Sequence, residues 1–148
     1  MIPRQISANG LNLIKQFEGC KLTAYQDAAG VWTIGYGSTF CVIPNMICTQ
    51  AEADARLKED VQHAVECVDR KVGPNLTQNQ FDALVSFVFN VGCAAFSTST
   101  LLRHINAGEF KQAALEFPRW DHAGALELDG LHKRRLAEQA LFLTPNAS

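Results

Sequence analysis

The sequence predicts an α+β fold, with a small antiparallel sheet in the first third and a mainly helical remainder. Strand-favouring residues and turn signals gather between residues 25 and 47. From residue 49 onward, helical spacing of apolar residues and two capping boxes dominate. We expect a single domain over residues 1–148, with a sheet-bearing lobe at about 1–60 and a helical lobe at about 61–148.

The first element is predicted as a helix over residues 7–18, because Leu11, Ile14 and Phe17 follow helical spacing and Gly19 is a suitable stop. A turn at Asp27-Ala-Ala-Gly30 and a second at Pro44-Asn45 then frame the strand-favouring run. These signals predict the small antiparallel sheet.

The helical part opens with a capping box at residues 49–52, and the long helix that follows ends at Gly73-Pro74. A second capping box, at residues 77–80, opens a helix that ends before Gly92. Shorter helices are predicted over residues 100–107, 110–117 (ended by Pro118) and 131–143. Two lobes joined by the long helix leave a cleft for a substrate, and residues 17–39 form one wall of it in this interpretation.

Composition excludes several classes of function. Apolar residues make up 47% of the chain and charged residues 19%, as in a folded globular protein. The formal net charge of −2 gives no sign of nucleic-acid binding or of attraction to anionic membranes. No apolar run reaches the ~20 residues of a membrane span, and the N-terminus lacks the apolar core of a secretion signal. We therefore expect the chain to remain in the cytoplasm of the cell that makes it.

The five cysteines, an odd number, argue against a complete disulfide framework. A bridge between Cys41 and Cys48 would close a short loop, but free thiols are the expectation for a reducing compartment. His63 and Cys67 lie four residues apart, either as half of a metal site or with Cys67 as a thiol packed on a helix face. Because no other residues show zinc-ligand spacing, we expect no metal and no cofactor.

Two acids and a hydroxyl in the first lobe have the types needed to cleave a glycosidic bond. Such cleavage uses one protonated carboxyl as the acid and one ionised carboxylate to activate water. Glu18 follows apolar residues at the end of a helix, and Asp27 begins a polar turn. The hydroxyl of Thr33 would help Asp27 to orient water. The alternatives are a helix-terminal glutamate and an aspartate that only forms an Asx turn.

The spacing of these three residues resembles the signature of the phage-type lysozymes, glycoside hydrolase family 24. That family carries Glu, eight residues, Asp, five residues and Thr, and Glu18, Asp27 and Thr33 match it without insertion. Later blocks are also similar and come in the same order: TQAEADARLKEDV, LTQNQFDALVSFVFNVG, STLLRHINAGEF and GLHKRRLAEQALF. The resemblance covers residues 6–143 and implies the two-lobed lysozyme-like fold.

The resemblance also implies roles for these residues. Glu18 would be the general acid on the β-1,4 bond between N-acetylmuramic acid and N-acetylglucosamine. Asp27, with Thr33 beside it, would position or activate the water. Hydrolysis with inversion requires the two carboxyl groups to lie about 6.5–9.5 Å apart.

Two further positions are implied to bind substrate or support the acid. Asn90 matches a position near substrate in relatives, and its alternative is a polar residue at a helix end. Arg134 or Arg135 would approach Glu18, with Arg134 as the candidate for substrate binding. The alternative for the run from Lys133 to Arg135 is a solvated helix face, which fits at least one of its three residues.

Three positions, among them Asn45 in place of a glycine, depart from the family pattern. Ser38 stands where many relatives have a histidine that braces the N-terminal lobe. Ala125 stands where a glycine is usual, so we expect a loop of different shape before Gly130.

Three functions remain open at this level. The leading one is a peptidoglycan hydrolase, an endolysin that acts as a monomer and lyses a bacterial host. The resemblance implies release from the host cytoplasm to the periplasmic wall through a holin, without stable membrane insertion or nucleic-acid binding. A lytic transglycosylase would need Glu18 but not the pair Asp27 and Thr33. A cell-wall-binding module without catalysis would need none of the three.

Overall fold

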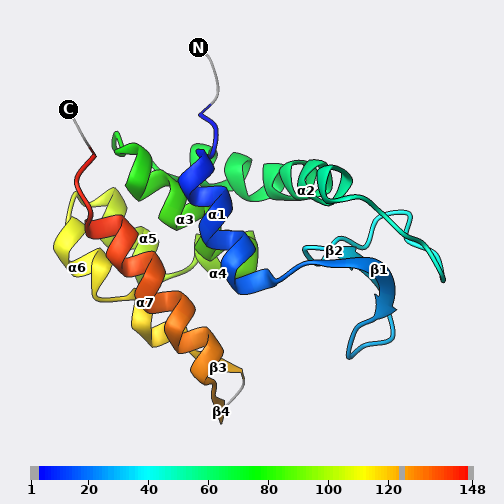
Figure 1. Cartoon of the computed structure of the whole chain (residues 1–148). Coiled ribbons are helices and arrows are strands. Elements are labelled where there is room, and N and C mark those ends of the chain that lie inside the picture. Colours follow the sequence, from blue (N-terminus) through cyan, green and yellow to red (C-terminus); the bar gives the residue numbers. More distant parts are fainter. Residues whose placement is uncertain (1–3, 124–125, 147–148) are drawn as a thin grey trace. The chain divides into compact units, whose positions relative to one another are not determined.

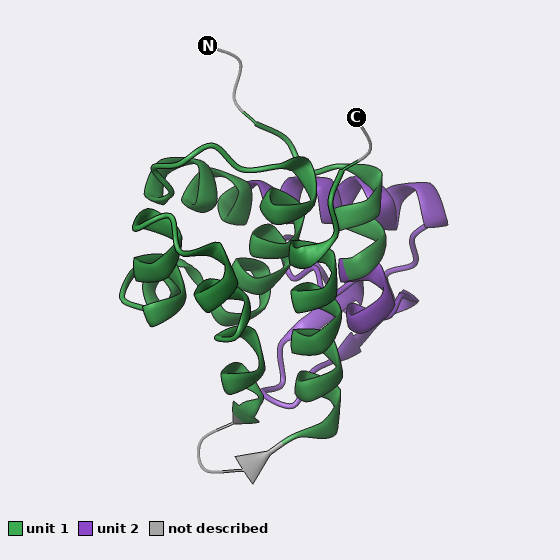
Figure 2. Ribbon diagram, turned by 90° about the vertical axis from the view of Figure 1, so that its left-hand side faces the viewer, with its two compact units in different colours: residues 1–13, 63–148 green, residues 14–62 purple. Residues whose placement is uncertain are grey.

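The computed structural model describes residues 4–123 and 126–146. The chain divides into two compact units, one of residues 14–62 and one of residues 1–13 with 63–148 (Figure 2). The boundaries fall inside two helices, α1 (Ala8–Glu18) and α2 (Gln50–Lys71), which are labelled in Figure 1. Both helices were expected from the sequence at nearly these bounds.

The 14–62 unit contains the predicted antiparallel sheet. Strand β1 (Lys21–Gln26) pairs with β2 (Trp32–Gly35), with Tyr25 opposite Thr33. The far side of β1 is bonded to residues 46–48, since Ala24 N–H donates to the Met46 carbonyl at 2.8 Å. The sheet therefore has the small size and the antiparallel sense that the sequence predicts.

The predicted capping box at the start of α2 is confirmed. The Thr49 hydroxyl accepts from the Glu52 N–H at 3.1 Å, and the Glu52 carboxylate accepts from the Thr49 N–H at 2.9 Å. The hydrogen bond from the Thr49 N–H is the main cause that lowers the pKa of the Glu52 carboxyl, and the Thr49 side chain lowers this pKa further.

Ser38, in the same unit, is bonded to Arg56 of α2. Arg56 Nη1 donates to the Ser38 hydroxyl at 3.2 Å and to the Phe40 carbonyl at 2.8 Å. Burial raises the pKa of the neighbouring Asp60, while the Ser38 hydroxyl and the Arg56 charge oppose the rise. These residues line an open cavity of about 410 Å³. Arg56, on α2, thus ties segment 38–40 to the helix.

The second unit contains the remaining elements, which are short apart from two helices. They are α3 (Gln78–Val91), α4 (Cys93–Ser97), α5 (Thr100–Asn106), α6 (Phe110–Ala114), the 3-10 helix η1 (Phe117–Trp120), β3 (His122–Ala123), β4 (Leu126–Glu127) and α7 (Asp129–Leu143). The capping box of Thr77 and Gln80 at the start of α3 is confirmed. No helix among the described residues is both long and apolar enough to cross a bilayer.

The core of this unit forms where α3 packs against α7. Phe87 on α3 is fully buried and makes edge-to-face contacts with three other rings. Its ring centroid lies 6.2 Å from Phe96, 5.6 Å from Phe117 and 5.4 Å from Trp120. Such contacts stabilise the core beyond the area they bury.

Residues 1–13 group with this second unit, whereas the sequence placed them in the sheet-bearing lobe. The reason is Asp82 on α3, which is fully buried and accepts hydrogen bonds from the Ser7 N–H at 3.0 Å and from the Ser7 hydroxyl. Gly10 allows the close approach, because a Cβ there would lie 2.8 Å from Asp82 Cβ. Buried polar groups need such partners, and residue 7 supplies them.

Several short elements of this unit differ from the sequence-based expectation. Helix α4 and the hairpin of β3 and β4 were not predicted, because elements of five and two residues are too short to show periodicity. The helix predicted over residues 110–117 ends at Ala114. Pro118 lies inside η1 rather than ending a helix, since a first-turn proline loses no hydrogen bond. Ala125 lies outside the described residues.

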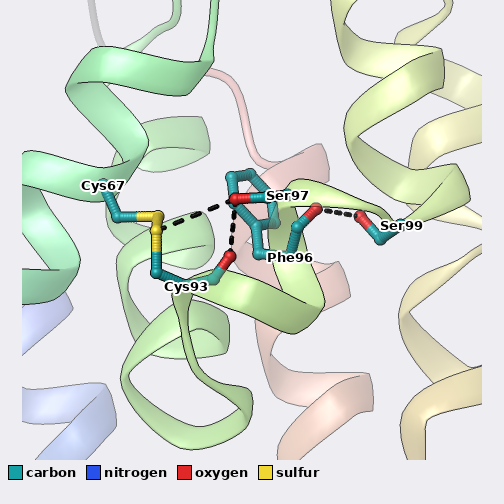
Figure 3. The surroundings of a disulfide bond; sticks show 5 residues. All are labelled: Cys67, Cys93, Phe96, Ser97 and Ser99. Atoms are coloured by element: carbon teal, nitrogen blue, oxygen red, sulfur yellow. Dashed lines mark hydrogen bonds between the residues drawn. A yellow bond between two sulfur atoms is a disulfide. The ribbon is translucent and has the colours of Figure 1, made fainter.

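The expectation of free thiols is wrong for two cysteines. Cys67 on α2 and Cys93 at the start of α4 form a disulfide (Figure 3). Cys67 is therefore neither a packed free thiol nor half of a metal site with His63. Cys20, Cys41 and Cys48 are free, so the bridge considered between the last two is absent. Within the described residues, no group of three histidine, cysteine or acidic side chains can hold a metal ion.

We predict that this disulfide contributes strongly to stability, because it closes a loop across a sequence separation of 26 residues. Replacing both Cys67 and Cys93 with serine should lower the free energy of unfolding by about 3.5 kcal/mol. Thermal unfolding with and without a reductant measures this. Cys20→Ser is the control, and it should keep the sensitivity to reductant. Equal melting temperatures for wild type and the double variant would contradict the prediction.

We also predict that Arg56→Met raises the pKa of Asp60 further, because the opposing positive charge is lost. It should lower stability by about 1–2 kcal/mol, because the Phe40 carbonyl loses a charged donor. NMR titration of Asp60 and urea unfolding measure the two effects. Lys58→Met, two residues away on an exposed part of α2, is the matched control and should change neither.

The raised pKa of Asp60 predicts the direction in which the stability of the fold changes with pH. Because the pKa of Asp60 is raised in the folded state, its contribution to stability is full below the unfolded value of about 3.9 and is lost as pH rises through the folded value. Asp60→Asn should remove that dependence.

Candidate active site

Glu18 is the last residue of α1 and its side chain is half-buried. Its carboxylate lies beside Gly37, where a Cβ would sit 3.7 Å from Glu18 Oε2. Gly37 has a φ of 87°, a conformation that favours glycine. The acid therefore lies against the backbone that follows β2, in the same unit as Asp27 and Thr33.

The end of α1 is held to the start of α2 through polar and aromatic contacts. Lys15 Nζ forms an ion pair with Asp54 at 3.3 Å and lies 5.6 Å from the centroid of the Tyr36 ring. The Tyr36 hydroxyl accepts a hydrogen bond from Gln50 at 2.9 Å, and Gln50 also donates to Asp54. These contacts fix the turn of α1 that carries Glu18.

Asp27 forms an Asx turn in the loop between β1 and β2. One carboxylate oxygen, Oδ1, accepts from the N–H groups of Ala29 and Val31, each at 2.9 Å. The side chain is exposed, and Oδ2 accepts no hydrogen bond from a described residue. The turn orients the carboxylate, leaving Oδ2 for water or substrate. The sequence left open whether Asp27 forms a turn or serves a catalytic site, and this geometry is compatible with both.

Thr33 is joined to Asp27 through a shared carbonyl. Its hydroxyl donates to the Val31 carbonyl at 2.9 Å, and that carbonyl also accepts from the Asp27 N–H at 2.9 Å. Thr33 is only 3% exposed, so its hydroxyl is fixed in place. The two residues form one rigid unit around Val31.

The other candidate residues lie in the second unit. Asn90 is an exposed residue near the end of α3, and its Oδ1 accepts from Arg135 Nη2 on α7. Arg134 and Arg135 are both buried, while Lys133 is exposed, so the solvated-face alternative holds for Lys133 alone. The predicted approach of Arg134 or Arg135 to Glu18 joins residues of different units and stays a prediction.

Both arginines pair with Glu138, a fully buried residue that the sequence analysis did not single out. Arg134 Nε donates to Glu138 Oε2 at 3.3 Å, and Arg135 Nη1 lies 3.1 Å from Oε1. Ser86 on α3 donates to Glu138 Oε2 at 2.5 Å and accepts from Arg134 through its carbonyl at 3.1 Å. The spacing of three and four residues on one helix was the signal for these pairs.

Burial raises the pKa of Glu138, and the charges of Arg135 and Arg134 oppose the rise. Burial also lowers the pKa of Arg135, which Glu138 opposes. The guanidinium of Arg135 lies 5.0 Å from the centroid of the Phe87 ring, a cation–π contact with the core. A buried charge cluster of this kind holds its members in one arrangement.

Comparisons with known proteins show the family to which the chain belongs. A protein-family model described as phage lysozyme matches residues 15–138. An endolysin of Acyrthosiphon pisum secondary endosymbiont phage 1 is 46% identical over 141 residues, covering 93% of this chain and 97% of that protein. An endolysin of Bacillus phage PZA is 48% identical, and this chain spans about half (55%) of its length.

Among solved structures, the muramidase domain of SpmX from Asticaccaulis excentricus is similar throughout. The TM-score is 0.92 and the identity 45%, with 96% of this chain and 99% of that domain covered. Structural likeness at this level confirms the lysozyme-like fold expected from the sequence.

We predict that Asp27→Asn keeps the loop between β1 and β2, because an amide oxygen still accepts from Ala29 and Val31. Its melting temperature should remain within about 2 °C of wild type. Asp27→Ala loses both hydrogen bonds and should cost about 1 kcal/mol. Thermal unfolding of the two variants measures this. Equal destabilisation by both substitutions would show that the Asx turn does not hold the loop.

Proposed function

Because this chain belongs to the phage lysozyme family and is a lysozyme, we propose that it cleaves the β-1,4 bond between N-acetylmuramic acid and N-acetylglucosamine in peptidoglycan. The observation that carries the proposal is the arrangement of Asp27 and Thr33 around the Val31 carbonyl. An Asx turn alone does not need a buried threonine hydroxyl on the same carbonyl.

In this proposal Glu18 is the general acid that protonates the leaving oxygen. Its half-buried carboxyl lies at the end of α1, a helix that is tied to α2 by the ion pair of Lys15 with Asp54. A fixed acid keeps the donated proton within hydrogen-bond reach of the glycosidic oxygen. Removing a positioned general acid costs roughly 10²–10⁴-fold in rate.

Asp27 is the residue that positions the attacking water. Its Oδ1 is occupied by the Ala29 and Val31 N–H groups, so Oδ2 accepts the proton of the water. Thr33, fixed by the same carbonyl, helps to orient that water. Direct attack by water inverts the anomeric centre, and it requires the two carboxyl groups to lie about 6.5–9.5 Å apart.

Asn90 and Arg134 are proposed as substrate-binding residues, with an arginine beside Glu18 that supports the acid. The endolysin names of the relatives support host lysis as the biological role. We propose that the protein acts as a monomer on the periplasmic wall, after release from the host cytoplasm through a holin-type lesion.

The test is the digestion of purified Gram-negative peptidoglycan by wild type, Glu18→Gln and Asp27→Asn. Wild type should release muropeptides with reducing ends, and each variant should be slower by at least about 100-fold while remaining folded. Thr33→Ser, which keeps the hydroxyl, should stay much more active than Thr33→Val. Lys133→Gln, on the exposed face of α7, is the unrelated control.

Mass spectrometry of the products separates the alternatives. Anhydro-sugar ends would identify a lytic transglycosylase instead. Equal digestion by wild type and Glu18→Gln would mean that another residue is the acid. Lysis of intact Gram-negative cells from outside, without permeabilisation, would contradict the holin requirement.

A further inference from the structure

The hydrogen bond between Asn90 and Arg135 fixes which end of the Asn90 amide faces outward. A guanidinium has donors only, so its partner must be the amide oxygen, Oδ1. The amide nitrogen, Nδ2, is then turned away from Arg135. It donates to no described residue, and Asn90 is exposed at the end of α3. The side-chain amide of Asn90 therefore turns its N–H end outward and its carbonyl end toward Arg135.

Arg135 is itself held, so the amide cannot reverse by moving its partner. The side chain is fully buried, stacked near the Phe87 ring and paired with Glu138. Glu138 is in turn held by the Ser86 hydroxyl and by Arg134. A flipped Asn90 amide would point its NH2 group at the guanidinium, and the buried Arg135 Nη2 would lose its acceptor.

We propose that Arg135 is a positioning residue that fixes the polarity of the Asn90 amide, and that Asn90 thereby recognises the acetamido carbonyl oxygen of an N-acetylated sugar. This inference rests on the proposed function, in that it assigns the group that Asn90 binds. It makes the Arg135–Glu138 pair a determinant of substrate specificity rather than a contribution to the core alone.

The chemistry of the substrate selects the acetamido carbonyl. Sugar hydroxyls both donate and accept, so they pair with either end of an amide and need no fixed polarity. A carbonyl oxygen only accepts and needs the N–H end. A de-N-acetylated sugar carries an ammonium group, which only donates and therefore opposes Nδ2. Enzymes discriminate strongly when a fixed polar group is left unpaired by the wrong substrate.

Asn90→Asp is the most informative variant, because aspartate has nearly the same shape as asparagine and strengthens the contact with Arg135. It replaces the outward N–H donor with a carboxylate oxygen, which only accepts hydrogen bonds and carries negative charge. We expect wild type to favour N-acetylated peptidoglycan over chemically de-N-acetylated peptidoglycan by about five- to tenfold in kcat/KM, the worth of one hydrogen bond. For Asn90→Asp this preference should fall to one or below, mainly through KM.

Arg135→Lys tests the positioning role. It keeps a positive charge for Glu138 but loses the fork that reaches Asn90. It should lose the same preference as Asn90→Asp, and the double variant should lose no more than either single one. Lys133→Gln, the neighbouring exposed position, should keep the full preference. Arg135→Lys activity lowered equally on both walls would assign Arg135 a purely structural role and overturn the inference.

Binding separates this inference from the proposed mechanism. Dissociation constants for the two walls are measured in the Glu18→Gln background, where no hydrolysis is needed. A binding preference that Asn90→Asp abolishes supports the inference even if the assignment of Glu18 as the acid fails. A preference that survives Asn90→Asp, or no preference in the parent protein, overturns it.

Discussion

The helical unit depends on one carboxylate that is buried with two arginines. Glu138 of α7 lies between Arg134, Arg135 and the hydroxyl of Ser86 on α3, so the two long helices of this unit meet through charge as well as through apolar packing. Removing one partner of such a cluster leaves an uncompensated buried charge, which typically costs 3–5 kcal/mol. The register of α3 against α7, and with it the place of Asn90, follows from that constraint.

In the sheet-bearing unit, backbone groups hold the polar side chains in place. The carbonyl of Val31 accepts from the Asp27 N–H and the Thr33 hydroxyl, while the Val31 N–H donates to the Asp27 carboxylate. The two polar side chains, of Asp27 and Thr33, are therefore both bonded to the backbone of one residue, Val31. A site residue that also forms its own turn needs little support from the rest of the chain, which suits a small two-stranded sheet.

The two candidate regions each orient an outward-facing side chain in the same way. In each, a side chain that faces outward has its other polar atom occupied by a fixed group, so only one chemical face is offered: Oδ2 of Asp27 and Nδ2 of Asn90. Orientation of this kind reduces the reorganisation needed when substrate binds.

Local patterns in the sequence were enough to predict the α+β class, both capping boxes, the long helices and the candidate set of Glu18, Asp27 and Thr33. These depend on neighbours within a few residues, where periodicity and turn chemistry act. The folded structure was needed to show that Cys67 pairs with Cys93, that Ser7 bonds to Asp82, that Arg56 ties segment 38–40 to α2, and that Arg135 reaches Asn90. Each of these joins residues at least 16 positions apart, and no local pattern specifies which distant partner satisfies a buried polar group.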